Sequence, residues 1–289
     1  MLAAALLIFC ARAGCAERVA AARAAQAAPA SSADPLDTAA SKGDAATVAT
    51  LLTQGADANA KDKNGYTALM FAAGAGSADV AKLLLDHGAD ISAKDKRGYT
   101  SLMFDAISGT VDAAKLLLDR GADVAATDND GLTAFMYAAA SGHDDIAALL
   151  LTRGAAVNGA TNRGYTALMY AAEYGRTSTV TFLLAHGADA SARTEDGMTP
   201  LVEALEADNV PCVTQLVDHG ADVNGHDRDG WTPLMFAATY VGTADVANLL
   251  IDHGANVNAR NRKGESVLEI AMDSDRNDML AVLRGRGAR

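Results

Sequence analysis

Histidine and cysteine are the side chains of this sequence best suited to metal binding or nucleophilic catalysis. Four of the six histidines directly precede a Gly-Ala pair: His87, His186, His219 and His253. At a helix C-terminus, a histidine can donate to the last carbonyl groups and oppose the helix dipole favourably. Packed helices lie roughly 10 Å apart, too far for imidazoles of neighbouring helices to bind one zinc ion. We therefore expect structural histidines and no metal site.

The three cysteines give little support for thiol or disulfide chemistry. Cys10 and Cys15 lie in an apolar N-terminal segment, and Cys212 follows Pro211 near the expected start of a helix. A helix start could lower the pKa of Cys212, although we favour a small buried side chain. The sequence also has no nucleophile elbow, phosphate loop or His-Glu-x-x-His motif. It predicts no catalytic residue and no cofactor, and hence no enzyme.

Glycine recurs in two series that share one period. The Gly-Ala pairs begin at Gly55, Gly88, Gly121, Gly154, Gly187, Gly220, Gly254 and Gly287. The second series is Gly65, Gly98, Gly131, Gly164, Gly197, Gly230 and Gly264. Each series advances by 33 residues, apart from a single extra residue late in the chain. A fixed period of this length predicts a stack of similar structural units.

One unit can be interpreted residue by residue. Residues 62–65 form a turn that uses the conformational freedom of Gly65, and Thr67 can cap a helix over residues 68–75. A second helix follows, with Leu83, Leu84 and Leu85 as its expected buried side and Gly88 as its left-handed end. Such short helices cannot bury their apolar faces alone, so neighbouring units must stack.

Residues 230–238, Gly-Trp-Thr-Pro-Leu-Met-Phe-Ala-Ala, and 249–258, Leu-Leu-Ile-Asp-His-Gly-Ala-Asn-Val-Asn, resemble the ankyrin repeat. The resemblance covers residues 34–289. It implies an all-α solenoid of about eight helix-turn-helix repeats with protruding β-hairpin-like loops. One departure is that methionine replaces the histidine of the family's Thr-Pro-Leu-His motif. These methionines are Met70, Met103, Met136, Met169 and Met235.

The first and last repeats are expected to act as polar caps of the array. In the first repeat, Asp37 occupies the methionine position. In the last repeat, Glu269, Asp273, Asp275, Arg276 and Asp278 make the helices polar. We interpret the array as complete on this basis.

The N-terminal residues are interpreted as a targeting segment. Residues 1–16 match the short apolar region and small-residue cleavage site of a signal peptide, and residues 17–33 form an Ala- and Ser-rich linker. Lipidation of Cys15 and an untargeted extension remain alternatives. We expect an exported protein of a bacterial periplasm or the cell exterior, or a cytoplasmic one if the segment is not a signal.

Composition restricts the partner. The formal net charge of −12 argues against nucleic acid and anionic membranes, and the apolar N-terminal run is too short to span a bilayer. Half of the residues are apolar but only 5% are aromatic, which suits thin layers of closely packed helices. We expect a monomer that binds a protein.

Aromatic residues recur where the family places its binding face. The residue after each turn glycine is large: Tyr66, Tyr99, Leu132, Tyr165, Met198 and Trp231. Tyr174 and Tyr240 share a position near the end of the first helix. These rings either form a recognition strip or pack between neighbouring loops. A second row, Phe71, Phe104, Tyr137, Tyr170 and Phe236, is expected in the core. Eleven of the basic residues flank the loop tips, which we interpret as solvated positions.

The sixth repeat departs most from the others. Glu203 stands in the aromatic row and Pro211 enters the second helix, while Glu173 and Glu206 share one position in the fifth and sixth repeats. We hypothesise that a basic or amphipathic segment docks across repeats five to seven. A degenerate joint is the alternative. Asp105, where other repeats have alanine, is open to either interpretation.

The predicted function is therefore a protein-binding scaffold that uses the concave face of the array. Alternative functions are a stabilising or chaperone-like factor for one envelope enzyme and an effector delivered into a host cell.

Overall fold

The computed structural model describes residues 34–241, 244–274 and 277–289, without the side chains of Tyr240 and Val241. The predicted signal peptide (1–16), the linker (17–33) and Cys15 lie outside the described residues. The chain divides after Ala156 into two compact units, which are described separately below.

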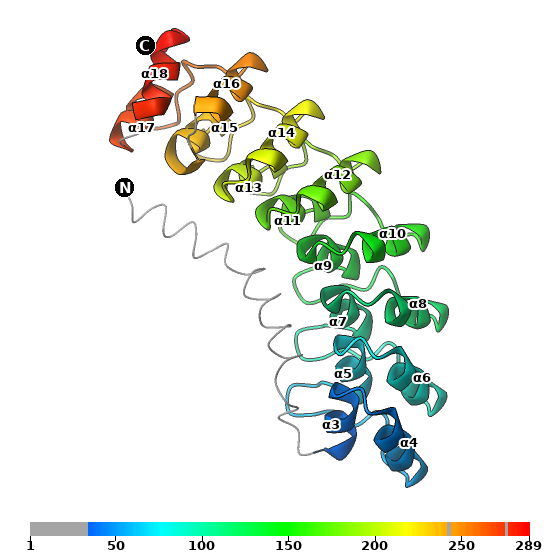
Figure 1. Cartoon of the computed structure of the whole chain (residues 1–289). Coiled ribbons are helices and arrows are strands. Elements are labelled where there is room, and N and C mark those ends of the chain that lie inside the picture. Colours follow the sequence, from blue (N-terminus) through cyan, green and yellow to red (C-terminus); the bar gives the residue numbers. More distant parts are fainter. Residues whose placement is uncertain (1–33, 242–243, 275–276) are drawn as a thin grey trace. The chain divides into compact units, whose positions relative to one another are not determined.

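The first unit contains four helix pairs, numbered here as repeats one to four (Figure 1). Their first helices lie side by side in one row, and their second helices lie in another. The first helices are α3 (Pro35–Ser41), α5 (Ala68–Gly74), α7 (Ser101–Ser108) and α9 (Ala134–Ser141). The second helices are α4 (Ala45–Thr53), α6 (Ala78–Asp86), α8 (Val111–Asp119) and α10 (Asp144–Thr152).

The second unit contains repeats five to eight and is built in the same way (Figure 1). Its first helices are α11 (Ala167–Glu173), α13 (Pro200–Glu206), α15 (Pro233–Phe236) with the π-helical turn η1 (Ala237–Val241), and α17 (Val267–Asp273). Its second helices are α12 (Thr177–Ala185), α14 (Val210–Asp218), α16 (Ala244–Asp252) and α18 (Asn277–Gly285). None of the described helices has the length and apolar character that crossing a bilayer requires. The expected all-α architecture is thus confirmed.

Local sequence signals set the helix boundaries. The Thr67 hydroxyl accepts the backbone N–H of Met70, and the same threonine cap recurs in repeats three to six. Gly88 takes a left-handed conformation with φ of 84° at the end of α6, as the sequence predicts. The residue inserted in the seventh repeat is absorbed by η1, because a π-helical turn holds one residue more than an α-turn.

The first helices of repeats two to seven are buried on nearly all sides, whereas the second helices bury one side only. All eight residues of α9 are buried, but α10 buries only Ile146, Ala147 and Leu150. The prediction that Leu83, Leu84 and Leu85 are all buried is wrong, because only Leu84 is fully buried. Consecutive helical residues are 100° apart, so three in a row cannot face one neighbour.

The loops between repeats are hairpin-like and carry no full strand in the described residues, only isolated bridges such as Thr127–Thr133. In the tip of the second repeat, the Asp62 carboxylate accepts the backbone N–H groups of Asn64 and Tyr66. Neighbouring tips are joined by backbone hydrogen bonds, for example from Lys96 N to Asn64 O at 3.0 Å. Each tip is therefore rigid and tied to the next one in its unit.

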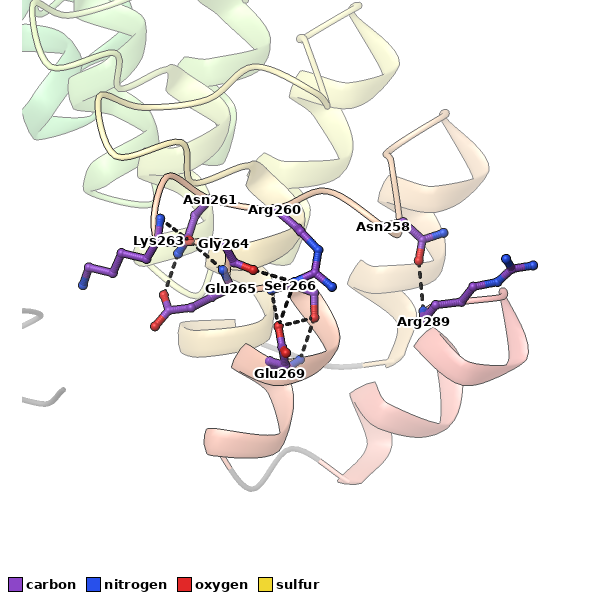
Figure 2. Close-up of polar contacts among 9 residues, drawn as sticks. All are labelled: Asn258, Arg260, Asn261, Lys263, Gly264, Glu265, Ser266, Glu269 and Arg289. Atoms are coloured by element: carbon purple, nitrogen blue, oxygen red, sulfur yellow. Dashed lines mark hydrogen bonds and ion pairs between the residues drawn. The ribbon is translucent and has the colours of Figure 1, made fainter.

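Asparagine side chains clamp successive repeats together. The Asn224 amide donates to Gly254 O at 2.9 Å, and its oxygen accepts from Asn256 N at 2.8 Å. In the last repeat, Asn258 accepts from the backbone N–H of Arg289 in the same way (Figure 2). One side-chain amide thus provides hydrogen-bond partners for a backbone C=O and a backbone N–H of the next repeat. Without it, these two backbone groups would need water as their partner.

The predicted polar caps are only partly supported. Asp37 is 3% exposed, so it does not provide a solvated face on the first repeat. It lies on the side of α3 that also buries Leu36 and Ala40. In the last repeat, Glu269 is exposed and completes a capping box with Ser266 (Figure 2). Asp273 and Asp278 are also exposed, whereas residues 275 and 276 lie outside the described range.

Asp105 on α7 is a buried acid at a position where most repeats have alanine. Its side chain is 0% exposed, and neither carboxyl oxygen has a hydrogen-bond partner among the described residues. Burial raises the pKa of Asp105 to about 8. The elements packed on α7 are α5, α8 and α9, whose titratable residues are Tyr137 on α9 and Asp112, Lys115 and Asp119 on α8. Desolvation therefore decides the protonation state of Asp105.

This arrangement predicts a pH-dependent stability. In the unfolded chain the pKa of Asp105 is about 3.8, whereas in the folded chain it is about 8. Folding therefore takes up a proton between these two pH values. As a consequence, the free energy of unfolding falls as the pH rises through this window. We expect Asp105→Ala to gain about 1.4 kcal/mol over the parent for each pH unit within it. Urea unfolding followed by circular dichroism at about pH 5 and pH 8 measures this difference.

Asp105→Asn is the matched control, because it keeps the shape and removes the charge. It should lose the pH dependence but gain less stability than alanine, since it buries an amide. Parallel pH profiles for the parent and both variants would contradict the assignment.

Candidate functional site

Two of the predicted partner-binding rings are buried in the first unit. Tyr66 is 9% exposed and Tyr99 is 1% exposed. The Tyr66 ring makes edge contacts with Phe71 of its own repeat and Phe104 of the next, both at 5.6 Å between centroids. The Tyr99 ring makes tilted contacts with Phe104 of its own repeat and Tyr137 of the next. Of the two alternatives, packing between neighbouring repeats therefore holds for Tyr66 and Tyr99.

Arg97 lies between these two tyrosines. The sequence pattern did not predict this contact. Its guanidinium donates to the Tyr66 hydroxyl at 2.7 Å and lies over the Tyr99 ring at 4.7 Å from the centroid. It also lies 3.6 Å from the buried Asp95 carboxylate, yet its side chain remains 38% exposed. The sequence does contain a signal for this contact. Arg97 lies in the same loop tip as Tyr99, and Tyr66 lies in the tip of the preceding repeat.

The rings of the second unit are more accessible. Tyr165 and Trp231 are half-exposed, and each contacts the aromatic ring of its own repeat, Tyr170 at 5.4 Å and Phe236 at 5.5 Å. In the first unit, a loop ring is covered by the aromatic residue of the following repeat. After Tyr165 that position is Glu203, and after Trp231 it is Ile270. The absence of an aromatic residue at these positions explains the greater exposure.

The acidic positions lie at the ends of two adjacent first helices. Glu173 ends α11 and Glu206 ends α13, and these helices pack against each other. Both glutamates are half-exposed, as is Tyr174 beside Glu173. Glu203 lies one turn earlier on α13 and is 3% exposed, so it belongs to the interior. The side chain of Tyr240 lies outside those described. The structure thus places Glu173 and Glu206 at the equivalent ends of two packed helices, with Tyr174 next to Glu173 in the chain.

The residues considered for chemistry have structural roles. The four predicted histidines each place Nδ1 2.7–2.8 Å from the carbonyl four residues earlier, as expected at a helix end. Cys212 is buried, and burial raises the pKa of its thiol, which rules out the alternative of a lowered pKa. No group of His, Cys, Asp or Glu suited to a metal ion occurs in the described part of the chain.

Comparison with known proteins supports the repeat assignment. The family model described as ankyrin repeats (3 copies) matches residues 36–128, 122–194 and 186–261. The crystal structure of the human ASB11 ankyrin repeat domain superimposes with a TM-score of 0.70 and 26% sequence identity. That match covers 77% of this chain and 99% of the human chain. No curated protein matches this sequence.

The aromatic row gives a test of the role of Glu203. Glu203→Phe places a ring at the position where five other repeats have phenylalanine or tyrosine and removes a carboxylate from the interior. We expect a higher free energy of unfolding, by about 1–2 kcal/mol, because an apolar side chain is buried in its place. Urea unfolding of the parent and the variant measures the change.

Glu203→Gln is the control for charge alone and should recover only part of the gain. A loss of stability in Glu203→Phe would show that the carboxylate is required by the fold.

Proposed function

This chain belongs to the ankyrin-repeat family, and we propose that it captures a protein partner on the face where α11 and α13 end. Ankyrin repeats generally serve as scaffolds for protein–protein interaction. The proposal concerns the second unit, where the loop rings and the helix-end positions are both accessible. In the first unit the equivalent rings are buried, so Tyr66 and Tyr99 are not part of this surface.

The observation that carries the proposal is the combination of charge and partly exposed aromatic area in repeats five to seven. Glu173 and Glu206 come from neighbouring helices, and Tyr174 lies next to Glu173 in the chain. Tyr165 and Trp231 lie on loops to either side of the sixth repeat. Aromatic side chains with one exposed side contribute strongly to protein interfaces, because they bury a large area at little entropic cost.

This surface favours a basic or amphipathic segment. Two glutamates at adjacent positions attract lysine or arginine side chains, and the half-exposed rings can accept apolar groups or cations on their faces. The equivalent positions in the first unit are Ser41, Gly74, Ile107 and Ala140, which carry no charge. In the second unit the acid recurs as Asp273, the last residue of α17, so acidic residues occupy this position in the second unit and not in the first.

Charge reversal tests the proposal. Glu173→Lys/Glu206→Lys should weaken binding of a basic peptide at least about tenfold, since it replaces attraction by repulsion. The peptide is selected from a random display library on the parent chain, and its affinity is measured by fluorescence anisotropy.

The matched control is Asp218→Lys/Asp252→Lys, which changes the net charge equally at the exposed ends of α14 and α16. It should retain binding to within about twofold, because these residues lie on the second helices. Equal losses in both variants, or unchanged binding in the first, would discard the proposal.

Export of the chain remains a second proposal, supported by the apolar character of residues 1–16. Expression of the full chain in a bacterium, with and without these residues, tests it directly. We expect the full chain in the periplasmic fraction in a shortened form and the truncated chain in the cytoplasm. A full-length chain retained in the cytoplasm would overturn the proposal.

A further inference from the structure

The loop tips of the first unit carry exposed lysines without a close ion pair, although Lys61 lies near enough to Asp90 to help lower the pKa of that carboxyl group. Lys61, Lys63, Lys94 and Lys96 are exposed, and none forms an ion pair with a carboxylate in the described residues. In the second unit, the tip arginines Arg163, Arg193 and Arg228 are paired with Asp196 or Asp222 at 2.8–3.4 Å. The tips of repeats two and three therefore differ from those of repeats five to seven, whereas the eighth tip again carries exposed bases, Arg262 and Lys263.

The lysines of the second and third repeats are held in a row. The Lys61 ammonium donates to Lys94 O at 3.1 Å, and the Lys94 ammonium donates to Thr127 O at 2.7 Å. Each contact crosses to the next repeat at the same loop position, so the row runs along the stack. Since each ammonium has three donors, further acceptors can bind without breaking these contacts.

The acidic residues of the same two tips do not cancel this charge at the surface. Asp95 is 7% exposed, and one oxygen of its carboxylate accepts the backbone N–H groups of Arg97 and Tyr99. Asp62 is half-buried and has the same role in its own loop. The exposed charge of these tips is thus positive. The row ends at the fourth tip, where Thr127, Asn129 and Asp130 stand at the positions of Lys94, Lys96 and Arg97.

Arg97 gives this basic row a fixed anchor. The Tyr66 hydroxyl, the Tyr99 ring and Asp95 define the orientation of its guanidinium, whose side chain is still 38% exposed. A pre-oriented guanidinium loses little entropy when it binds a carboxylate and can bind it through two parallel hydrogen bonds. Arginines of this kind are frequent among the residues that dominate interfaces.

We propose that the loops 61–66 and 94–99 bind an acidic segment of a protein partner, with Arg97 as the anchor and the four lysines as flanking contacts. The proposal rests on the protein-binding function proposed above but places a second surface, of opposite charge, on the other unit. A protein segment is favoured over nucleic acid, because the formal net charge of −12 repels an extended phosphate backbone but less strongly a short acidic peptide.

Selection of short peptides tests the proposal directly, because it requires no identified partner. Random peptides of about twelve residues are displayed on phage and selected on the full chain at physiological salt. We expect enrichment of peptides rich in Asp and Glu, and at least about a tenfold loss of their affinity in Lys94→Glu/Lys96→Glu.

The matched control is Lys82→Glu/Lys115→Glu, which changes the net charge equally on the second helices α6 and α8. It should keep the affinity for acidic peptides to within about twofold. Equal losses in both variants, or no enrichment of acidic peptides on the parent, would overturn the proposal. Tighter binding of a single-stranded thymidine oligonucleotide, lost only in the loop variant, would overturn it in favour of nucleic acid.

Arg97→Lys separates the anchor from the overall charge. It keeps the positive charge but loses the paired donors and the stacking on Tyr99, so we expect an affinity loss of about tenfold. Unchanged affinity would remove Arg97 from the anchor role.

Failure of this proposal is distinguishable from failure of the proposed function. Basic peptides and the Glu173 and Glu206 variants report on the second unit, whereas acidic peptides and the loop variants report on the first.

Discussion

A pair of helices of seven to nine residues cannot bury its apolar side chains without a neighbour, and this constraint shapes the whole chain. Within a unit, each inner first helix is covered by the first helices before and after it, so its small residues are removed from water on nearly every side. Alanine is common there because it lets the helices approach closely. Stability therefore depends on contacts between neighbouring repeats, and every change in one repeat is felt by the next.

The same dependence explains why equivalent residues differ in exposure. Tyr66 and Tyr165 occupy equivalent positions directly after a loop glycine. The following repeat places Phe104 next to Tyr66, but it has Glu203 at the corresponding position after Tyr165. One ring is buried and the other is half-exposed. A substitution within a repeat can thus create accessible aromatic area in the repeat before it. A binding surface in a solenoid can therefore arise when a side chain that covers a ring of the preceding repeat is replaced.

In the loops, one set of groups fixes the backbone conformation and another set is exposed for binding. Backbone hydrogen bonds and carboxylates such as that of Asp62 fix the shape of each tip, so the remaining side chains are free to vary in charge. Repeats two and three use this freedom for exposed lysines, and repeats five to seven pair their tip arginines with aspartates. The ends of the first helices differ in the opposite sense, with acidic residues in the second unit (Glu173, Glu206 and Asp273) and none in the first. A fixed backbone can therefore carry surfaces of opposite charge.

The sequence by itself determined the period, the helix pairs, the threonine caps, the glycine ends and the family, because these follow from local propensity repeated many times. It also located the histidines correctly, since a helix end is a local feature. Tertiary structure alone decided which rings are accessible, that Asp37 is buried and that Arg97 is clamped. The physical reason is that burial and side-chain pairing depend on residues a full repeat away, whose contacts no single repeat contains.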